Sequence, residues 1–582
     1  MPKNVMKLLK PSRNVGRNDF DLSHRHLMTA NFGELLPITC IETVPGDYIQ
    51  MRVSDLLRAC PMVTSPFMRV KQHIDVWFTP YDYMWHNFES FMTLKEDPAS
   101  SSLKGFDFCP CVTKDTLAYW ANKADPSVDF KDVVGSDYFT GSRKILDFLG
   151  YGSPTKVSTG DTDISPRVNL WRLLQYNKIW YDEYRQKYYD DGKRLLNPLQ
   201  GYSSPAYLYS VDDLECDSVA HSTLPNDSRI MAMCQMRYRL WKKDLYTGIL
   251  PSSQFGAVSA VTSPLSSNVV RLANSNGILG SDSVLSINTA SDGTLRGITN
   301  NSGTGAFTLR DNAGDLTVSS FDILALRKAE ALQIWRENAL RAGNRISDNM
   351  RAHYGDDAEY DDHRSTLLGS VDAPLNIGDI DSHSQTGSGA NQQLGDVAGK
   401  GLSSLNEKVF KFKAKKFGCI MVMFSILPEA EYESQGVDRM NQLLEREDYF
   451  QSEFQNCGLE AVSVNTLYYW AHGSQPYGYA PAYFGYKTKL DKCFEQFYSN
   501  MPFAPWASPK IDVPAYVEEQ GTNFLIPLAT LYINPQLFNR NFGIAVTGTP
   551  DAEATSEQVI CDFYFDVSAV RAMSVVGLPQ NI

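Results

Sequence analysis

The turn Pro45-Gly46-Asp47 leads into the segment Ile49-Gln50-Met51-Arg52-Val53, in which apolar and polar side chains alternate. Successive side chains of a strand point to opposite faces, so this alternation places the apolar side chains on one face and the polar ones on the other. The segment therefore predicts a β-strand with one buried face and one solvated face.

Similar strand signals occur toward both ends of the chain. They comprise Ile74, Val76 and Phe78, an apolar run from Phe410 to Pro428, and the late residues Cys561, Phe563, Phe565 and Val567. Strands from opposite ends of a chain commonly pair in one sheet, and this long-range pairing is characteristic of the Greek-key topology of jelly rolls. The sequence thus predicts a mainly β fold.

Two helices are predicted between these strands. Ser165-Pro166 offers an N-cap and a first-turn proline, and helical spacing follows at Leu170, Leu173, Asn177, Trp180 and Tyr184. The second helix begins near Ser319 and ends at Gly343, with an apolar stripe at Leu326, Ala329, Leu332, Trp335 and Ala339. Such stripes usually pack in a core, and we expect the same of both helices.

Two segments differ from the rest in composition. Residues 257–318 are rich in Ser, Thr, Asn and Gly and contain the turn pairs Asn276-Gly277 and Asp292-Gly293, which predict small β-hairpins or an ordered loop. Residues 381–404 are dominated by Ser, Gly and Gln and are expected to form a flexible surface loop. The remainder, from residue 19 to 582, is predicted to be one domain that carries these insertions.

Charge is distributed unevenly along the 582 residues. The net charge is −13, which argues against a general nucleic-acid coat, yet residues 1–18 contain no acid. The cations of this arm are Lys3, Lys7, Lys10, Arg13 and Arg17. A short basic arm can neutralise phosphates without reading sequence, so these residues are candidates for DNA contact, and a solvated terminus is the equally weighted alternative.

No pattern for catalysis, a metal or a cofactor stands out. The ten cysteines lack framework spacing and are expected to be free thiols. Cys109-Pro110-Cys111 and the pair His24 and His26 have too few neighbouring ligands for a metal site. Gly395–Lys400 departs from the phosphate-binding loop because only three residues separate its glycines and Gly401 follows the lysine. We therefore expect no enzyme activity.

A series of short blocks runs through most of the chain in a fixed order. The N-terminal blocks are Arg17-Asn18-Asp19-Phe20-Asp21-Leu22-Ser23-His24, Gly33-Glu34-Leu35-Leu36-Pro37 and Val44-Pro45-Gly46-Asp47. The later blocks are Tyr176-Asn177-Lys178-Ile179-Trp180, Lys243-Asp244-Leu245-Tyr246-Thr247-Gly248-Ile249-Leu250-Pro251, Arg341-Ala342-Gly343-Asn344-Arg345 and Gly395-Asp396-Val397-Ala398-Gly399-Lys400-Gly401. Together they resemble the major capsid proteins of the microviruses, and most closely the gokushovirus-like branch.

The resemblance implies an eight-stranded antiparallel jelly-roll barrel with long helical and loop insertions. It implies self-assembly into a T=1 icosahedral shell around a circular single-stranded DNA genome. The implied partners are other copies of the chain, a small basic DNA-packaging protein, a minor, spike or pilot protein, an internal scaffolding protein, and a host surface receptor. The protein would be assembled in the bacterial cytoplasm and reside in the virion, with no membrane insertion and no cofactor.

The resemblance also places an outward-projecting insertion at residues 257–318, around the three-fold axes. The apolar residues Val284, Leu285 and Ile287 are too few for a separate core, and three copies meeting at an axis would bury them. Two other functional classes stay open from composition alone. Aromatic-rich β folds also suit a secreted carbohydrate-binding or carbohydrate-active protein, although no signal peptide is visible, and the basic arm suits a nucleic-acid-binding module.

Overall fold

The computed structural model describes the chain in sections. These are residues 16–85, 88–93, 109–113, 142–152, 167–186, 188, 236–253, short strands between 271 and 310, and residues 323–342, 346–355, 363–381, 397–433, 436–455, 458–467, 476–509, 531–543 and 557–575. The chain divides into two compact units. The larger comprises Met1–Ser253 and Ala342–Ile582, and the smaller comprises Gln254–Arg341.

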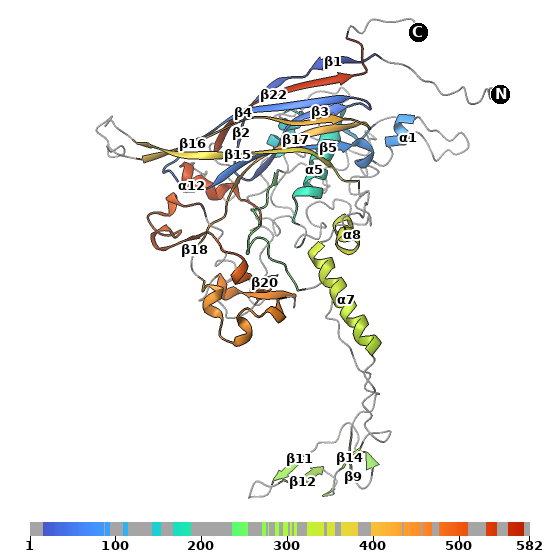
Figure 1. The fold of residues 1–582 in the computed structure, drawn as a ribbon, viewed down its shortest axis with the longest axis vertical. Helices are drawn as coiled ribbons and strands as arrows, with labels where there is room; N and C mark the ends of the chain where they lie inside the picture. Colours follow the sequence, from blue (N-terminus) through green and yellow to red (C-terminus); the bar gives the residue numbers. More distant parts are fainter. Residues whose placement is uncertain are drawn as a thin grey trace, which may run out of the picture. The chain divides into compact units, whose positions relative to one another are not determined.

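A ten-stranded antiparallel sheet dominates the larger unit (Figure 1). Its eight long strands are β2 (His24–Ala30), β3 (Glu34–Thr43), β4 (Tyr48–Ala59), β5 (Val70–Pro80), β15 (Thr366–Asp381), β16 (Val397–Lys413), β17 (Gly418–Pro428) and β22 (Val559–Arg571). The short strands β1 (Asn18–Asp21) and β8 (Arg237–Tyr238) add to β22 and β3, respectively. The predicted mainly β fold is confirmed.

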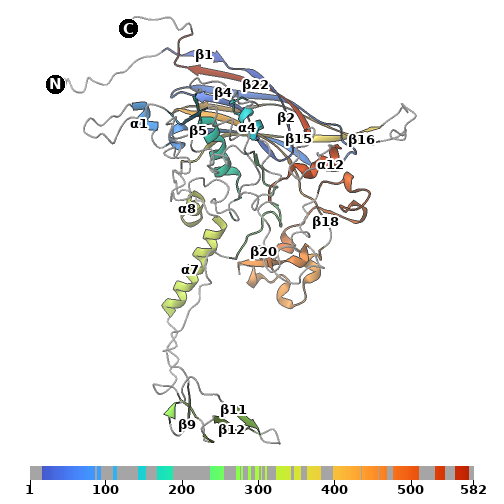
Figure 2. The ribbon, with the colours of Figure 1, turned by 180° about the vertical axis from the view of Figure 1, so that it is seen from behind.

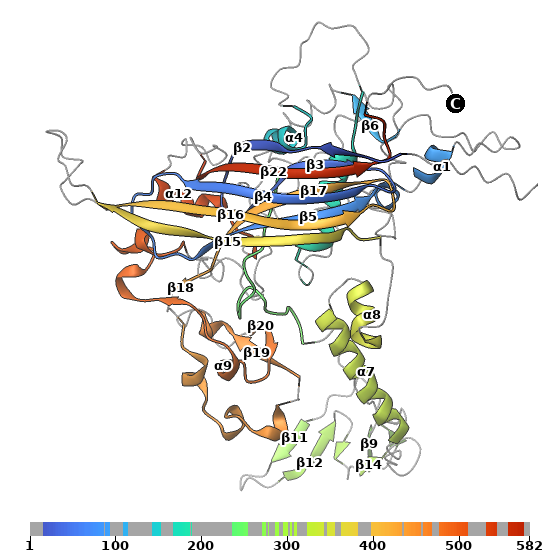
Figure 3. The same ribbon diagram turned by 45° about the horizontal axis from the view of Figure 1, so that its top comes forward.

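The long strands form two runs of four, β2-β22-β4-β16 and β15-β5-β17-β3, joined through the β15–β16 pair (Figure 3). Strand β22 from the C-terminal end lies between two strands from the N-terminal end, which confirms the predicted long-range pairing. The hydrogen-bonded path does not close on itself among the described residues. The closed eight-stranded jelly-roll barrel therefore stays a prediction.

The inner faces of the two runs meet in one hydrophobic core. In β4 the side chains of Ile49, Met51 and Val53 are fully or almost fully buried, as their alternation predicted. Across the layers, the rings of Phe424 in β17 and Phe563 in β22 pack edge to face with centroids 5.0 Å apart. Edge-to-face aromatic contacts of this kind stabilise a core beyond the area that they bury.

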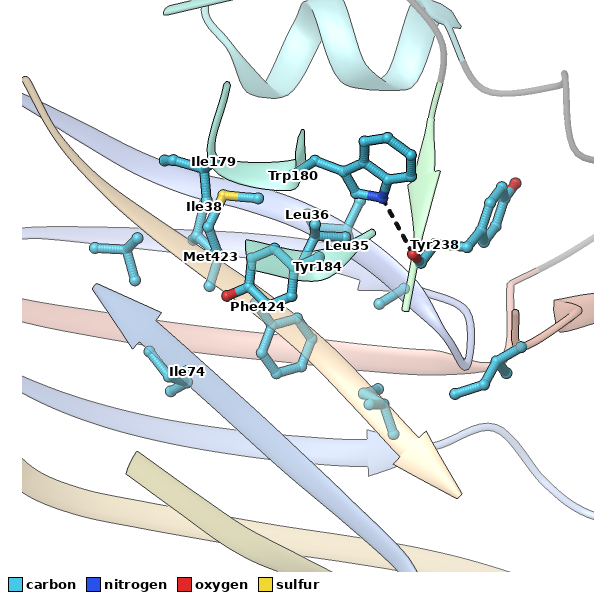
Figure 4. Close-up of a cluster of buried hydrophobic side chains, with 14 of the residues drawn as sticks. Leu35, Leu36, Ile38, Ile74, Ile179, Trp180, Tyr184, Tyr238, Met423 and Phe424 are labelled. Carbon is cyan, nitrogen blue, oxygen red and sulfur yellow. Dashed lines mark hydrogen bonds between the residues drawn. The ribbon is translucent and has the colours of Figure 1, made fainter. Parts of the chain in front are cut away.

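Helix α5 (Trp171–Ile179) and the π-helical turn that continues it (Trp180–Tyr184) pack on the second run of strands (Figures 2 and 4). The Gln175 side chain donates a hydrogen bond to the Cys419 carbonyl in β17 (2.7 Å), and the Trp180 indole donates to the Tyr238 carbonyl (3.4 Å). The predicted stripe is confirmed as core, but the predicted start is wrong. Residues Arg167–Asn169 instead form strand β7, because they pair with β6 (Cys111–Thr113).

The described residues of the smaller unit form two three-stranded sheets and one helix. The strands are β9 (Arg271–Asn274), β10 (Gly277–Ile278), β11 (Ser286–Thr289), β12 (Leu295–Asn300), β13 (Gly303–Thr304) and β14 (Thr308–Arg310). Helix α7 (Ile323–Ala342) ends just before Gly343, as predicted. Its stripe was wrongly predicted to be core, since Leu326, Leu332 and Trp335 are 46%, 41% and 55% exposed, whereas Ala339 is buried. Helical periodicity identifies an apolar face but not what covers it.

Two sequence-based boundaries need correction. The loop predicted over residues 381–404 is too long, because residues 397–404 belong to β16 and pair with β4 or β15. Their high Ser and Gly content is typical of a loop, so the sequence did not predict this strand, which pairs with β15 and β4. The apolar run from Phe410 to Pro428 is two strands rather than one, since β16 ends at Lys413 and β17 begins at Gly418.

Shorter elements complete the larger unit. They are α1 (Phe88–Thr93), α4 (Ser142–Phe148), α8 (Ile346–Tyr354), α9 (Phe484–Lys487), α12 (Asn539–Phe542), β18 (Tyr432–Glu433), β19 (Leu459–Ser463), β20 (Pro476–Pro481), β21 (Lys492–Cys493) and several 3-10 turns. Trp77 and Trp85 are both buried near the end of β5, and the Trp77 indole donates a hydrogen bond to the Tyr184 hydroxyl (2.9 Å). None of the described helices is long and apolar enough to cross a membrane.

Candidate subunit interface

Two loops of the larger unit expose large apolar side chains. One loop connects β4 to β5, and the other follows β21. The side chains are Val63, Phe67, Phe494, Met501 and Phe503, which are 53%, 74%, 57%, 48% and 46% exposed. We call these five residues the aromatic surface. Isolated exposed apolar residues are ordinary, whereas adjacent ones are typical of a binding surface.

Hydrogen bonds hold the two loops side by side. The Phe67 amide donates to the Trp506 carbonyl (2.8 Å), and the rings of these residues lie 6.0 Å apart. The Thr64 hydroxyl donates to the Pro505 carbonyl (2.9 Å). Within the second loop the Phe503 ring contacts the Phe497 ring, with centroids 6.0 Å apart. The exposed rings therefore belong to loops that are hydrogen-bonded to each other.

A glycine in β16 fixes the first loop to the sheet. Met62 and Gly399 exchange two backbone hydrogen bonds of 3.1 and 3.2 Å. A Cβ atom on Gly399 would lie 2.3 Å from the Thr64 carbonyl oxygen, so no side chain fits here unless the loop moves. This close approach of two backbone segments explains why position 399 of the Gly395–Gly401 block is a glycine, and the explanation does not involve phosphate binding.

The aromatic surface has the chemistry of association. Aromatic residues and methionine are enriched in the buried centres of protein interfaces, where they supply much of the binding free energy. Within the described part of the chain, no three His, Cys, Asp or Glu side chains are grouped so that they could hold a metal ion. An apolar and exposed surface is suited to contact with another protein surface.

Comparison with known proteins identifies the family of this chain. The model of the family described as "Capsid protein (F protein)" matches residues 10–580. This chain is a member of that phage capsid protein family. Capsid protein VP1 of Chlamydia phage 1 is 24% identical over 98% of this chain and 96% of its own length. Capsid protein VP1 of Bdellovibrio phage phiMH2K is 22% identical over the same shares of the two chains.

These relatives confirm the microvirus resemblance across nearly the whole chain. The capsid protein is a structural component of the virion, and its family indicates a structural and non-enzymatic role. Family membership also favours the capsid interpretation over the carbohydrate-binding or carbohydrate-active alternative.

The predicted DNA-contacting and protrusion residues of this capsid protein are only partly described. Lys3, Lys7, Lys10 and Arg13 lie outside the described residues, as do Val284 and Leu285. Arg17 is exposed, and its guanidinium lies beside the turn at Gly46, 3.3 Å from where a Cβ would sit. Ile287 belongs to β11 and pairs with Ile298 of β12. Both roles stay predictions.

His24 and His26 lie on the same side of β2, with ring centroids 5.0 Å apart. His24 contacts the Leu22 carbonyl (2.7 Å) and the Thr39 hydroxyl (2.9 Å) through its two ring nitrogens. Burial, followed by the neighbouring His24, lowers the pKa of His26. This environment favours the neutral ring of His26 in a packed pair. All seven described cysteines, Cys109 and Cys111 among them, are free of disulfides.

The sequence did not reveal the aromatic surface. Its side chains come from loops about 430 residues apart, and none of them belongs to a periodic pattern. Only the overall composition pointed toward an interface: the chain has 12% aromatic residues, with 30 Tyr and 29 Phe, and no recognisable catalytic motif. Composition of this kind suits wet interfaces, but only the fold selects which rings are exposed.

Proposed function

We propose that this capsid protein self-assembles into a small T=1 icosahedral shell of about sixty copies that encloses a circular single-stranded DNA genome. Its family membership and the exposed aromatic surface support the proposal. Contacts that close around symmetry axes set the size of such a shell, and many modest contacts together make it stable.

The aromatic surface is the observation on which the assembly proposal depends. A large aromatic side chain buries about 150–250 Å² when fully covered, so five half-exposed apolar side chains offer on the order of several hundred Å². A standard interface needs about 800 Å² per partner. The aromatic surface is therefore large enough for the centre of one subunit contact, with polar residues supplying the rim.

The test is the double variant Phe67→Ser/Phe503→Ser. Both side chains are exposed in the single chain, so the urea midpoint of the unassembled protein should change little. The yield of shells in negative stain or by sedimentation should fall at least tenfold, because the centre of the contact is lost. Leu27→Ser is the matched control, since Leu27 is 71% exposed on β2 and belongs to neither loop. Wild-type shell yield from the double variant would refute this interface.

The basic arm is proposed to contact the genome inside the shell. Five phosphate contacts to single-stranded DNA would give a log–log salt slope of roughly −3.5. Changing Lys3, Lys7, Lys10, Arg13 and Arg17 to Gln should leave shells able to form while lowering the DNA that they retain. Unchanged DNA content would show that the arm takes no part. A small basic DNA-packaging protein, a minor or spike protein and an internal scaffold are further proposed partners.

Residues 257–318 are proposed to project from the shell and attach to a host receptor. The composition supports an exposed element, and the described strands there are short. Replacing residues 262–314 with a Gly-Ser linker should leave filled particles that attach poorly to the host. Retained infectivity would refute the attachment role, and loss of assembly would assign the segment to the shell itself.

A further inference from the structure

The outward faces of β4 and β16 form a basic strip on an acidic protein. Outward positions of these two neighbouring strands carry six exposed cations: Arg52, Arg58, Lys400, Lys408, Lys411 and Lys413. They carry no acid, although the net charge of the whole chain is −13. We call these six residues the basic strip.

Strand register brings four of these cations together at one end. Arg52 pairs with Lys408, Gln50 with Lys411 and Tyr48 with Lys413. Neighbouring strands lie about 4.8 Å apart, and alternate residues of a strand lie about 6.7 Å apart, so the cations form a short compact row. A bulge between Lys408 and Phe410 keeps Lys411 and Lys413 on the same face as Lys408.

These cations lack the partners that other surface cations have. On β2 of the same sheet, Arg25 forms an ion pair with Asp562 (2.6 Å). None of the six forms an ion pair with any residue that the structure describes, even though Asp566 lies opposite Arg52 in register and the exposed Glu407 precedes Lys408. The pKa of Lys408 is lowered first by the adjacent Lys411 side chain, then by slight desolvation, and then by the charge of Arg52. The strip thus holds cations that form no ion pair with a described residue, although the acids Glu407 and Asp566 lie beside it.

Aromatic rings accompany the charge. Tyr48 of β4 and Tyr564 of β22 occupy outward positions of the same sheet and are 37% and 49% exposed. Tyr564 pairs with Ser54, two positions along β4 from Arg52. Arg17 lies beside Gly46, at the sheet end that carries Tyr48 and Lys413. Cations that track a backbone and rings that stack on bases are the two components of single-strand binding surfaces.

We infer that the basic strip, with Tyr48 and Tyr564, binds the backbone and bases of single-stranded nucleic acid without sequence preference. This inference rests on the proposed function, because the strip would hold the enclosed genome. An acidic protein segment would use the cations but not two exposed rings, and duplex DNA would hide its bases from them. Single-stranded DNA is thus the ligand that can contact both the cations, through its phosphates, and the two tyrosine rings, through its bases.

The experiment uses the full-length unassembled protein and a fluorescent oligo(dT) of about 12 nucleotides, with anisotropy measured over a range of salt concentrations. The variant is Arg52→Gln/Lys408→Gln/Lys411→Gln. Loss of three phosphate contacts should lower the log–log salt slope by about 2. Tyr564→Ala should weaken binding roughly tenfold while leaving the slope unchanged.

The matched control is Lys71→Gln/Lys242→Gln/Lys489→Gln, which removes the same charge from cations paired with Asp372, Glu429 and Asp438. The control should keep the wild-type slope. Equal losses in test and control variants would show that only net charge matters, and an unchanged slope in the test variant would refute the strip. Poly-glutamate that binds as tightly, with the same dependence on Arg52 and Tyr564, would assign the surface to acidic proteins instead.

Shell formation is measured separately on each protein. A wild-type chain that binds oligo(dT) through the strip but forms no shells would refute the proposed capsid assembly and leave the strip standing. Shells that form normally while the strip variants bind DNA like the wild type would refute only the strip.

Discussion

The two faces of strand β22 of this capsid protein lie in opposite environments, one buried and one exposed. Phe563 is completely buried against Phe424, whereas the next residue, Tyr564, is 49% exposed on the opposite face. The inward face packs against the second run of strands, and the outward face continues the surface of β4 that carries the basic strip. Because side chains alternate along the strand, one face contributes to the core and the other to the proposed binding surface. Substitutions on the two faces should therefore affect stability and binding separately.

The largest expected effect is on the inward face. Phe563→Ala removes a buried aromatic side chain and leaves a cavity, which should lower the free energy of unfolding by about 3–5 kcal/mol. Tyr564→Ala is the matched control, because it removes a ring of similar size from the adjacent, exposed position and should cost far less. Urea unfolding of the unassembled proteins measures both. Equal losses from the two variants would contradict the separation of the faces.

A charged group on the inward face gives the next largest effect. Asp55 of β4 is buried between the layers, where the Gln72 side-chain amide donates to its carboxylate oxygens at 3.1 and 3.2 Å. Burial raises the pKa of Asp55 to about 6, although the hydrogen bonds from Gln72 and from the Leu405 backbone oppose the shift.

The raised pKa fixes the sign of the pH dependence. Between its unfolded and folded pKa values, the folded state binds more protons at Asp55 than the unfolded state does. Stability contributed by this residue is therefore present at low pH and is lost as the pH rises through about 6. Relative to Asp55→Asn, the wild-type protein should lose about 2 kcal/mol between pH 4.5 and 7. Parallel pH profiles for the two proteins would contradict this role of Asp55.

The inward face was also the easier one to predict from sequence. The alternation at Ile49, Met51 and Val53 predicts a strand and its buried side, because the period of two is a local property. The pairing of β22 with β4 followed from the Greek-key expectation. The strand at Arg167–Asn169 and the first part of β16 were missed, since pairing with β6 and with β15, rather than local propensity, holds them in place.

The surfaces proposed for binding were not predicted, for a different physical reason. The basic strip brings Arg52 together with Lys408 and Lys411, which are more than 350 residues away along the chain, and the overall composition shows only an acidic protein. The aromatic surface likewise joins Phe67 to Phe503 through hydrogen bonds between loops. Helix α7 shows the converse, because its periodic stripe was visible in the sequence but its exposure depends on the surrounding fold.

The smallest expected effect concerns the outward face, at Lys408. Its pKa is lowered by the neighbouring cations, so the folded state releases this proton more readily than the unfolded state. Unfolding then takes up protons, and stability should rise slightly as the pH increases toward the ordinary lysine pKa of about 10.4. Lys408→Gln should abolish that rise and leave the urea midpoint at neutral pH unchanged or slightly higher.

Salt separates this effect from that of Asp55. Lys408 is exposed and its neighbours act through solvent, so about 0.5 M NaCl should screen the repulsion and remove the difference between wild type and Lys408→Gln. Asp55 is destabilised by burial, which salt does not screen, so the difference between wild type and Asp55→Asn should persist at the same salt concentration. If both differences disappeared in salt, the carboxyl would have to be responding to surface charge. The two faces of β4 would then be electrostatically coupled rather than separate.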